Sequence, residues 1–346
     1  MNIEINLADK TELEKWDEIV KSSPYGTIFH TIEWLRIAEK HTNSRIYPFI
    51  GKNGNEIVGI FPIFYRKIGL TKMVFSPPPK TAIPYMGPIL IGYDQLKQDK
   101  KEYINNVFHE NINKFINESI KPDFINFTFP TNFIDMRIFK SMNYRVEPSY
   151  HYVQNIPRDL VSLEKNFSGS ARRNVKKAEK DGIKLTFGGK EDLKKLYNML
   201  YERYKDQDRL IPISEDYLLD IYDSFYPEKL RIFILNFEDK IIGGGIKLCY
   251  NNKIIDWIGQ PKAQMRTQND YLHREVMRWG IENGYQQYEI IGANNPTISQ
   301  FKSKFNPSLN ICFNAKKTTF IGNISERLYK LLNLKLISMN LKKKTS

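Results

Sequence analysis

The sequence has few of the residues from which metal sites and covalent catalytic sites are built. Its 346 residues include only two cysteines and five histidines. Cys249 and Cys312 are each isolated in an apolar, strand-like run, so we expect buried free thiols. The histidines lie far apart and form no His-x-x-x-His pair, and no Gly-x-Ser-x-Gly motif is present. We therefore expect no metal site, no cofactor and no covalent nucleophile.

Glycine-rich phosphate loops and long apolar runs are absent as well. Neither the Gly-x-x-x-x-Gly-Lys-Ser/Thr motif nor the Gly-x-Gly-x-x-Gly motif occurs. Gly243–Gly245 leads into strand-like residues, which predicts close backbone packing or a bulge. No segment approaches the roughly 18 apolar residues that span a bilayer, and the N-terminal segment has no charged region followed by an apolar core. We expect a cytoplasmic protein without a signal peptide.

Positive charge is what the chain has in excess. Lysine and arginine number 52 against 39 acidic residues, which gives a net charge of +13. This excess favours an anionic partner such as a nucleic acid, a phosphorylated substrate or an acidic membrane surface. The alternative explanation is a composition rich in Lys, Ile and Asn that reflects an AT-rich genome.

The predicted elements occur in the same order twice, and the length also favours two domains. In each round, helices lead to a hairpin, a strand, a long helix, a buried strand and a short helix bearing Phe-Lys. Residues 57–60 echo 241–246, and residues 138–143 echo 300–306. The shared order favours a duplicated α/β (α+β) domain. We expect domains at 1–158 and 159–320, followed by a basic amphipathic helix at 321–346.

The stretch from Arg266 to Asn306 is the most informative part of the second round. Asn269 or Asp270 is expected to cap a helix that Gly284 ends, and a strand and a polar Asn-Asn-Pro turn follow. In the first round, the proline-rich run 73–88 predicts a shaped loop instead of a regular element. A strand that ends in a polar loop places side chains at a sheet edge, where ligands commonly bind.

Two basic features of the second round are candidate sites. Arg172, Arg173 and Lys176 recur at spacings of one to four on a predicted helix, and such a charged side suits phosphate contacts. The alternative is a solvated helix face. Lys302 follows Phe301; if Phe301 anchors in the core, Lys302 is held at the strand end and can neutralise a phosphate or stabilise a developing oxyanion. The alternative is an ordinary surface lysine.

The chain resembles the FemABX-like aminoacyltransferase family, which is built of two GNAT-type acyltransferase domains. The resemblance covers nearly the whole chain and depends on short motifs: residues 29–34, Gly87-Pro88, residues 172–182, Gly284, Tyr288-Glu289 and Phe301-Lys302. It implies two GNAT-like domains, each a mixed central sheet flanked by helices, with the transfer site in the second.

The resemblance also implies an activity, namely amide-bond formation between an aminoacyl group from aminoacyl-tRNA and an amine of a peptidoglycan precursor. By this resemblance Lys302 is the catalytic residue. Phosphate contacts are expected from the basic helix. The remaining substrate-binding candidates are the two aromatic residues, the arginine and the turn asparagine at Trp34, Tyr217, Arg209 and Asn294. The proton acceptor is unassigned, with Asp256 and Glu289 both considered.

Two alternatives stay open. One is an N-acyltransferase that uses acyl-CoA or an acyl-carrier protein, although Arg266–Tyr271 lacks the glycines of an ordinary CoA loop. The other is a non-catalytic protein that binds RNA or a membrane surface. The C-terminal tail supports peripheral contact with the inner membrane face, because an apolar helix face precedes three lysines at its end; these residues are Ile324, Leu328, Leu331, Leu332, Leu336 and Lys342–Lys344. The alternative for the tail is a helix packed on the domain with a frayed end.

Overall fold

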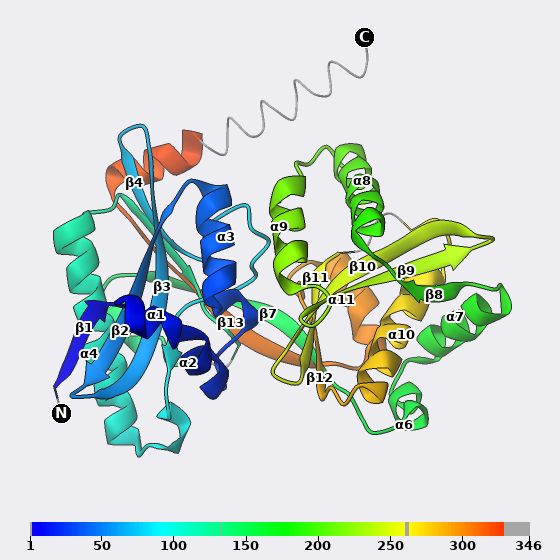
Figure 1. Cartoon of the computed structure of the whole chain (residues 1–346), viewed down its shortest axis with the longest axis horizontal. Helices are drawn as coiled ribbons and strands as arrows, with labels where there is room; N and C mark the ends of the chain where they lie inside the picture. The colour runs from blue at the N-terminus through cyan, green and yellow to red at the C-terminus, as the bar shows by residue number, and fades with distance from the viewer. Residues whose placement is uncertain (1, 132, 260–262, 329–346) are drawn as a thin grey trace, which may run out of the picture. The chain divides into compact units, whose positions relative to one another are not determined.

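A computed structural model of the chain describes residues 2–131, 133–259 and 263–328 (Figure 1). These residues form two compact units. Unit 1 comprises Met1–Ser149 and Ile311–Ser346, and unit 2 comprises Tyr150–Asn310. The chain therefore leaves unit 1, builds unit 2 and returns to unit 1. The domain limits at residues 158 and 320 remain predictions.

Unit 1 is a mixed sheet with helices. Its strands lie in the order β1-β2-β3-β4-β6-β13, with β5 beside β3, and only the β4–β6 pair is parallel. The strands are β1 (Ile3–Leu7), β2 (Arg45–Asn53), β3 (Glu56–Ile68), β4 (Thr71–Ser76), β5 (Ile89–Leu90), β6 (Phe124–Thr128) and β13 (Ser308–Thr318). The helices are α1 (Lys10–Glu14), α2 (Trp16–Ser22), α3 (Ile32–Thr42), α4 (Gln98–Phe115) and α5 (Arg137–Ser141), and residues 320–328 are helical too.

Unit 2 repeats this design. Its strands lie in the order β7-β12-β11-β10-β9-β8, and only the β11–β12 pair is parallel. The strands are β7 (Arg145–Asn155), β8 (Lys184–Phe187), β9 (Leu230–Phe237), β10 (Lys240–Tyr250), β11 (Lys253–Ile258) and β12 (Gln287–Ile290). The helices are α6 (Leu160–Lys165), α7 (Gly169–Lys180), α8 (Lys190–Asp206), α9 (Glu215–Phe225), α10 (Gln268–Glu282) and α11 (Pro296–Lys302).

The two units share one strand plan. In each, a hairpin of long strands is followed by a third antiparallel strand, a long helix and a parallel strand. The long helix is α4 in unit 1 and α10 in unit 2, and a short helix, α5 or α11, comes after the parallel strand. A parallel pair requires such a crossover connection. The α/β architecture of two similar mixed sheets, predicted from the sequence, is confirmed.

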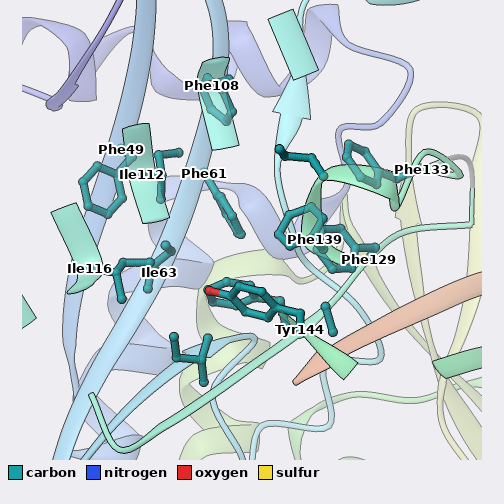
Figure 2. Close-up of a cluster of buried hydrophobic side chains, with 14 of the residues drawn as sticks. Phe49, Phe61, Ile63, Phe108, Ile112, Ile116, Phe129, Phe133, Phe139 and Tyr144 are labelled. Atoms are coloured by element: carbon teal, nitrogen blue, oxygen red, sulfur yellow. The ribbon is translucent and has the colours of Figure 1, made fainter. Parts of the chain in front are cut away.

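The core of unit 1 is almost wholly apolar and rich in aromatic rings. Figure 2 shows Phe129, Phe133 and Phe139 gathered together, and the ring of Phe129 lies 5.1 Å from Phe133 and 4.8 Å from Phe139. Phe108 contributes from α4 and is fully buried. Rings at such separations, stacked in the first pair and edge-to-face in the second, add to the free energy gained by burying apolar area.

Glycines shape one strand of unit 2, as the sequence predicts. The pairing of β10 with β9 shifts register between Ile241 and Gly243, which is a bulge. A Cβ at Gly243 would lie 2.7 Å from Nε2 of Gln268, and one at Gly245 would lie 2.6 Å from Nζ of Lys247. The three glycines thus let other groups approach the backbone closely.

Two local predictions were wrong. Part of the run 73–88 is regular, because β4 includes Met73–Ser76 and pairs with both β3 and β6. The β-prone residues at the start of that run win over the prolines that follow. Helix α10 begins before the predicted caps: its N-cap is Thr267, and Asp270 lies buried inside the first turn.

Candidate active site

Lys302 is held at the carboxyl end of β12. Asn295 starts α11 by accepting a hydrogen bond from the N–H of Ile298 at 3.2 Å. Phe301 packs on the unit 2 core, where its ring lies 5.6 Å from the ring of His273. The Nζ of Lys302 donates a hydrogen bond to the carbonyl oxygen of Ile291, directly after β12. The structure therefore confirms the expected anchoring of Phe301, and Lys302 is partly buried instead of freely solvated.

A buried ion pair belongs to the same electrostatic cluster. Lys247 on β10 and Asp256 on β11 are cross-strand partners, and their side chains form a salt bridge. Lys247 has 0% and Asp256 has 7% of its surface exposed. Burial raises the pKa of Asp256, but the charges of Lys247, His273 and Lys302 outweigh it and lower the pKa to about 2. Asp256 is therefore an ionised counter-charge at neutral pH and a poor proton acceptor.

His273 and Tyr288 form a second buried polar pair. The Tyr288 hydroxyl and Nδ1 of His273 are 2.9 Å apart, and the residues are 0% and 1% exposed. Burial lowers the pKa of His273 to about 3; Asp256 opposes this shift, and the two lysines add to it. Burial raises the pKa of Tyr288 well above its usual value. Both side chains are therefore neutral at physiological pH.

Lys302 combines positive charge with a sheltered position. Burial lowers its pKa from the usual value, the charge of Asp256 raises it, and the charge of Lys247 lowers it further. An ammonium group has three donors, of which the Ile291 carbonyl takes one. A cation in a partly desolvated place stabilises a nearby anion more strongly than one in water. This arrangement suits a developing oxyanion.

A basic pocket of about 680 Å³ lies where α7 meets the start of α10. Its charged residues are four cations and two carboxylates, at Arg173, Lys177, Arg266, Lys304, Asp181 and Asp270. Asp270 is buried and accepts hydrogen bonds from Asn174 at 3.2 Å and from Lys304 at 3.3 Å. Phe301 and Lys304 both line the pocket. Lys302 therefore lies on the same short segment as one wall of the pocket.

The three basic residues predicted to contact phosphates, which we call the basic stripe, have different surroundings on α7. Arg173 lines the pocket, whereas Lys176 is exposed on α7 and is not part of the pocket lining. The guanidinium of Arg172 donates to the carbonyl oxygens of Lys165 and Phe167 at 3.1 and 2.9 Å. Arg172 thus satisfies backbone acceptors at the end of α6. Within the stripe, Arg173 is best placed to contact a ligand.

The predicted acceptor residues are spread over both units. Trp34 is fully buried in unit 1, with its ring 5.0 Å from that of Phe29. In unit 2, Tyr217 is buried on α9, and Arg209 is exposed with its guanidinium 5.6 Å from the ring of Tyr204. Their part in binding an acceptor stays a prediction.

Asn294 ties the polar turn to β7. Its Oδ1 accepts a hydrogen bond from the N–H of Tyr150 at 2.9 Å, and its Nδ2 donates to the carbonyl oxygen of Tyr150 at 3.1 Å. Both contacts hold the turn in place just before α11. A role of Asn294 in substrate binding also stays a prediction.

Sequence reasoning did not single out Lys247 and His273, and it named Tyr288 only as part of a family motif, without a role. A signal for Lys247 was present, because it is the one charged residue in the otherwise apolar run 241–250. Asp256 likewise interrupts the apolar run 254–258. Charges inside apolar strands are costly unless they are paired, so each of these two residues predicts a partner.

Comparison with known proteins agrees with this fold. The GNAT acetyltransferase domain family matches residues 165–303. A UDP-N-acetylmuramoylpentapeptide-lysine N(6)-alanyltransferase of Weissella viridescens is 19% identical over 304 residues, which are 83% of this chain and 86% of that protein. The crystal structure of FemX has a TM-score of 0.67 at 13% identity, over 95% of this chain and 100% of that one.

The chain is similar to the FemABX-like acyltransferases. A tandem GNAT protein from the clavulanic acid biosynthesis pathway also has the fold, with a TM-score of 0.53 at 9% identity over 91% of this chain and 98% of that one. The predicted resemblance and the predicted enzyme class are confirmed. The FemABX-like chain carries its GNAT match over α7–β12 and α11, the elements that hold Lys302 and the basic pocket.

Proposed function

We propose that this FemABX-like protein transfers an aminoacyl group from aminoacyl-tRNA to the amine of a cell-wall peptide precursor. The observation that carries the proposal is the position of Lys302, fixed at the end of β12 near the Lys247–Asp256 pair. The basic pocket, which is lined by Arg173 on α7 and by Lys304 on the segment of Lys302, supports an anionic donor. The family resemblance supplies the substrate classes.

The reaction needs an oxyanion stabiliser more than a nucleophilic side chain. The acceptor amine attacks the ester carbonyl, a C–N bond forms, and the carbonyl electron pair moves to oxygen. The ammonium of Lys302 stabilises that negative charge. Collapse of the intermediate breaks the C–O bond, the amine loses one proton, and the departing ribose oxygen gains one. Because the ester is already activated, positioning both substrates can replace a covalent intermediate.

The loop before α10 supports tRNA over CoA as the donor. In an ordinary GNAT protein, backbone N–H groups there face the CoA pyrophosphate. Here the side chain Oε1 of Gln268 accepts hydrogen bonds from the N–H groups of Gln264 and Met265, both at 2.9 Å. Its Nε2 donates to the carbonyl oxygen of Ile242 at 3.1 Å. Two backbone donors are therefore occupied by a buried glutamine.

A donor panel tests the proposal. Charged tRNA, acetyl-CoA and an acyl-carrier protein are offered separately with an amine-bearing peptide precursor, and the product mass is measured. We expect transfer from charged tRNA alone. Transfer from acetyl-CoA or the acyl-carrier protein alone would instead establish the N-acyltransferase alternative. Salt-sensitive RNA binding without transfer from any donor would make the protein a non-catalytic binder.

The proposal also concerns location. Charged tRNA is a cytoplasmic substrate, so we place the reaction in the cytoplasm, with peripheral contact at the inner membrane face. In the described part of the chain, no helix has the length and hydropathy needed to cross a bilayer. Of the tail residues behind the membrane prediction, Ile324 and Leu328 are described, whereas Leu331, Leu332, Leu336 and Lys342–Lys344 lie outside the described residues.

A further inference from the structure

The helix at 320–328 is seated with its polar side inward. Gly322 is buried, and a Cβ there would collide with the backbone of Asp123. Ser325 and Thr71 are hydrogen-bonded through their hydroxyl groups at 2.7 Å, and Glu326 forms an ion pair with Lys316. These positions, spaced three and four apart, form one helix face. An amphipathic helix that packs on a core would normally turn its apolar side inward.

The apolar side of this helix faces outward. Phe320 is 79% exposed, and the other three apolar residues of the helix, Ile321, Ile324 and Leu328, are 55%, 42% and 54% exposed. Burying such side chains is favourable by roughly 1.5 to 3 kcal/mol each. Their joint exposure on a single helix is therefore a sign of a missing partner surface.

The tip of the β3–β4 hairpin, which lies beside this helix, also exposes apolar side chains. Leu70 is the most exposed large hydrophobic residue among those described, at 89%, and Ile68 is 48% exposed. The hydrogen bond between the hydroxyl groups of Thr71 and Ser325 places the hairpin tip beside the helix, as Figure 1 also shows. We call these six residues the apolar face: Ile68, Leu70, Phe320, Ile321, Ile324 and Leu328.

Cations accompany the apolar face. Lys67 and Lys72 oppose one another across the hairpin, Arg66 precedes Lys67, and Arg327 precedes Leu328 on the helix. The nearby carboxylates are already engaged: Glu326 by Lys316, and Asp123 by the N–H of Lys72 and the hydroxyl of Thr319. The sequence after the helix, 329–346, has five lysines and no acidic residue. The charge around the face therefore complements an anionic surface.

We propose that the apolar face docks unit 1 on an anionic lipid bilayer. Apolar side chains from the hairpin tip and the helix enter the headgroup boundary, and the lysines and arginines meet acidic lipid headgroups. This role is separate from the transfer chemistry. It deepens the proposed function only in bringing the enzyme to the surface where a lipid-linked acceptor is found.

Vesicle co-sedimentation of the full-length protein tests this inference. Vesicles of phosphatidylcholine alone are compared with vesicles containing phosphatidylglycerol, each with the parent chain and a Leu70→Ser, Phe320→Ser double variant. We expect binding to the acidic vesicles and about a tenfold or greater loss in the double variant. Val161→Ser is the matched control, because Val161 on α6 is 80% exposed and lies in unit 2.

Three results would overturn the inference. The first is that the parent chain does not bind vesicles. The second is that the double variant binds as well as the parent chain. The third is that the parent chain binds neutral and acidic vesicles equally. Self-association that the double variant abolishes, without vesicle binding, would assign the face to a second copy of the chain. Transfer to a water-soluble acceptor is measured in parallel and should be unchanged in the double variant. If the parent chain transfers the group but does not bind vesicles, the proposed function is retained and the docking face is rejected. If it binds acidic vesicles but transfers nothing, the docking face is retained and the proposed function is rejected.

Discussion

The two units use one strand plan but bury different chemistry around their long helices. The residues that α4 buries in unit 1 are three apolar ones and two neutral ones, Ile104, Phe108, Ile112, Asn105 and His109. Helix α10 in unit 2 buries several charged or polar groups, including Gln268, Asp270, His273, Arg274 and Glu275. Buried charge is expensive unless it is paired. Unit 1 is therefore built as an apolar scaffold, whereas unit 2 pairs the charged groups that it buries.

The strongest test of this difference between the units is to remove the lysine of each Phe-Lys pair. Lys302→Ala should lower kcat by about 100-fold or more, because it deletes a preorganised oxyanion stabiliser. Lys140→Ala, the echo on α5 of unit 1, should leave kcat unchanged, since Lys140 is exposed. Steady-state transfer assays with both variants make the test. Equal rates for Lys302→Ala and the parent would remove Lys302 from the mechanism.

The buried ion pair of unit 2 comes next. Asp256→Asn leaves Lys247 buried without its counter-charge, so we expect a loss of about 3 to 5 kcal/mol in unfolding free energy, measured by urea denaturation. The double variant Lys247→Met, Asp256→Leu should recover most of that stability, because well-packed apolar residues replace buried pairs at little cost. A double variant as unstable as the single one would contradict this account.

The same substitution should change the pH dependence of transfer. Lys302 acts as a cation, so activity falls as the pH rises through its pKa, which burial holds below the usual 10.5. Removing the charge of Asp256 takes away the group that raises this pKa. The alkaline limb of the kcat profile of Asp256→Asn should therefore move to lower pH. An unmoved limb would mean that Lys302 does not set it.

The basic pocket gives a smaller, salt-dependent effect. Arg173→Gln should raise KM for charged tRNA by roughly tenfold and reduce the slope of log KM against log salt by about one. Lys176→Gln is the comparison, because Lys176 lies on the same helix and is not part of the pocket lining. If Lys176→Gln raised KM more than Arg173→Gln did, the donor would contact the exposed side of α7 instead of the pocket.

Acid sensitivity is an effect on stability that both units share. Burial lowers the pKa of His30 and His109 to about 4 and that of His273 to about 3. These values lie below 6.5, so the unfolded chain takes up protons first as the pH falls. The stability is complete above pH 6.5 and is lost below it, by up to about 1.4 kcal/mol per pH unit for each histidine. Urea unfolding at pH 7 and pH 5 measures this, and His109→Gln should flatten the slope.

Sequence reasoning reached the fold because its signals were local and repeated. The hairpin through residues 51–57, the cap at Gly284 and the Phe-Lys echoes each depend on a few neighbouring residues. The position of Lys302 could be predicted from its neighbour Phe301, because a phenylalanine is expected to pack against the core. Sequence reasoning failed where neighbouring residues favour different structures. In β4, the β-prone residues outweighed the prolines that follow them.

The charged interior of unit 2 was harder to predict. Lys247 and Asp256 lie nine positions apart and meet only through the register of β10 against β11. His273 and Tyr288 meet because α10 packs on β12, which no spacing rule specifies. Arg172 shows the opposite failure: its basic character suggested a ligand, whereas two backbone carbonyls take its guanidinium.

The return of the chain to unit 1 has a consequence for biosynthesis. The antiparallel neighbour of β6 is β13, which the ribosome makes after every strand of unit 2. Until then β6 presents an open edge, and open edges invite pairing with other chains. The nascent protein must therefore keep the sheet of unit 1 incomplete through the synthesis of unit 2. A fragment that ends after unit 2 would keep that exposed edge permanently.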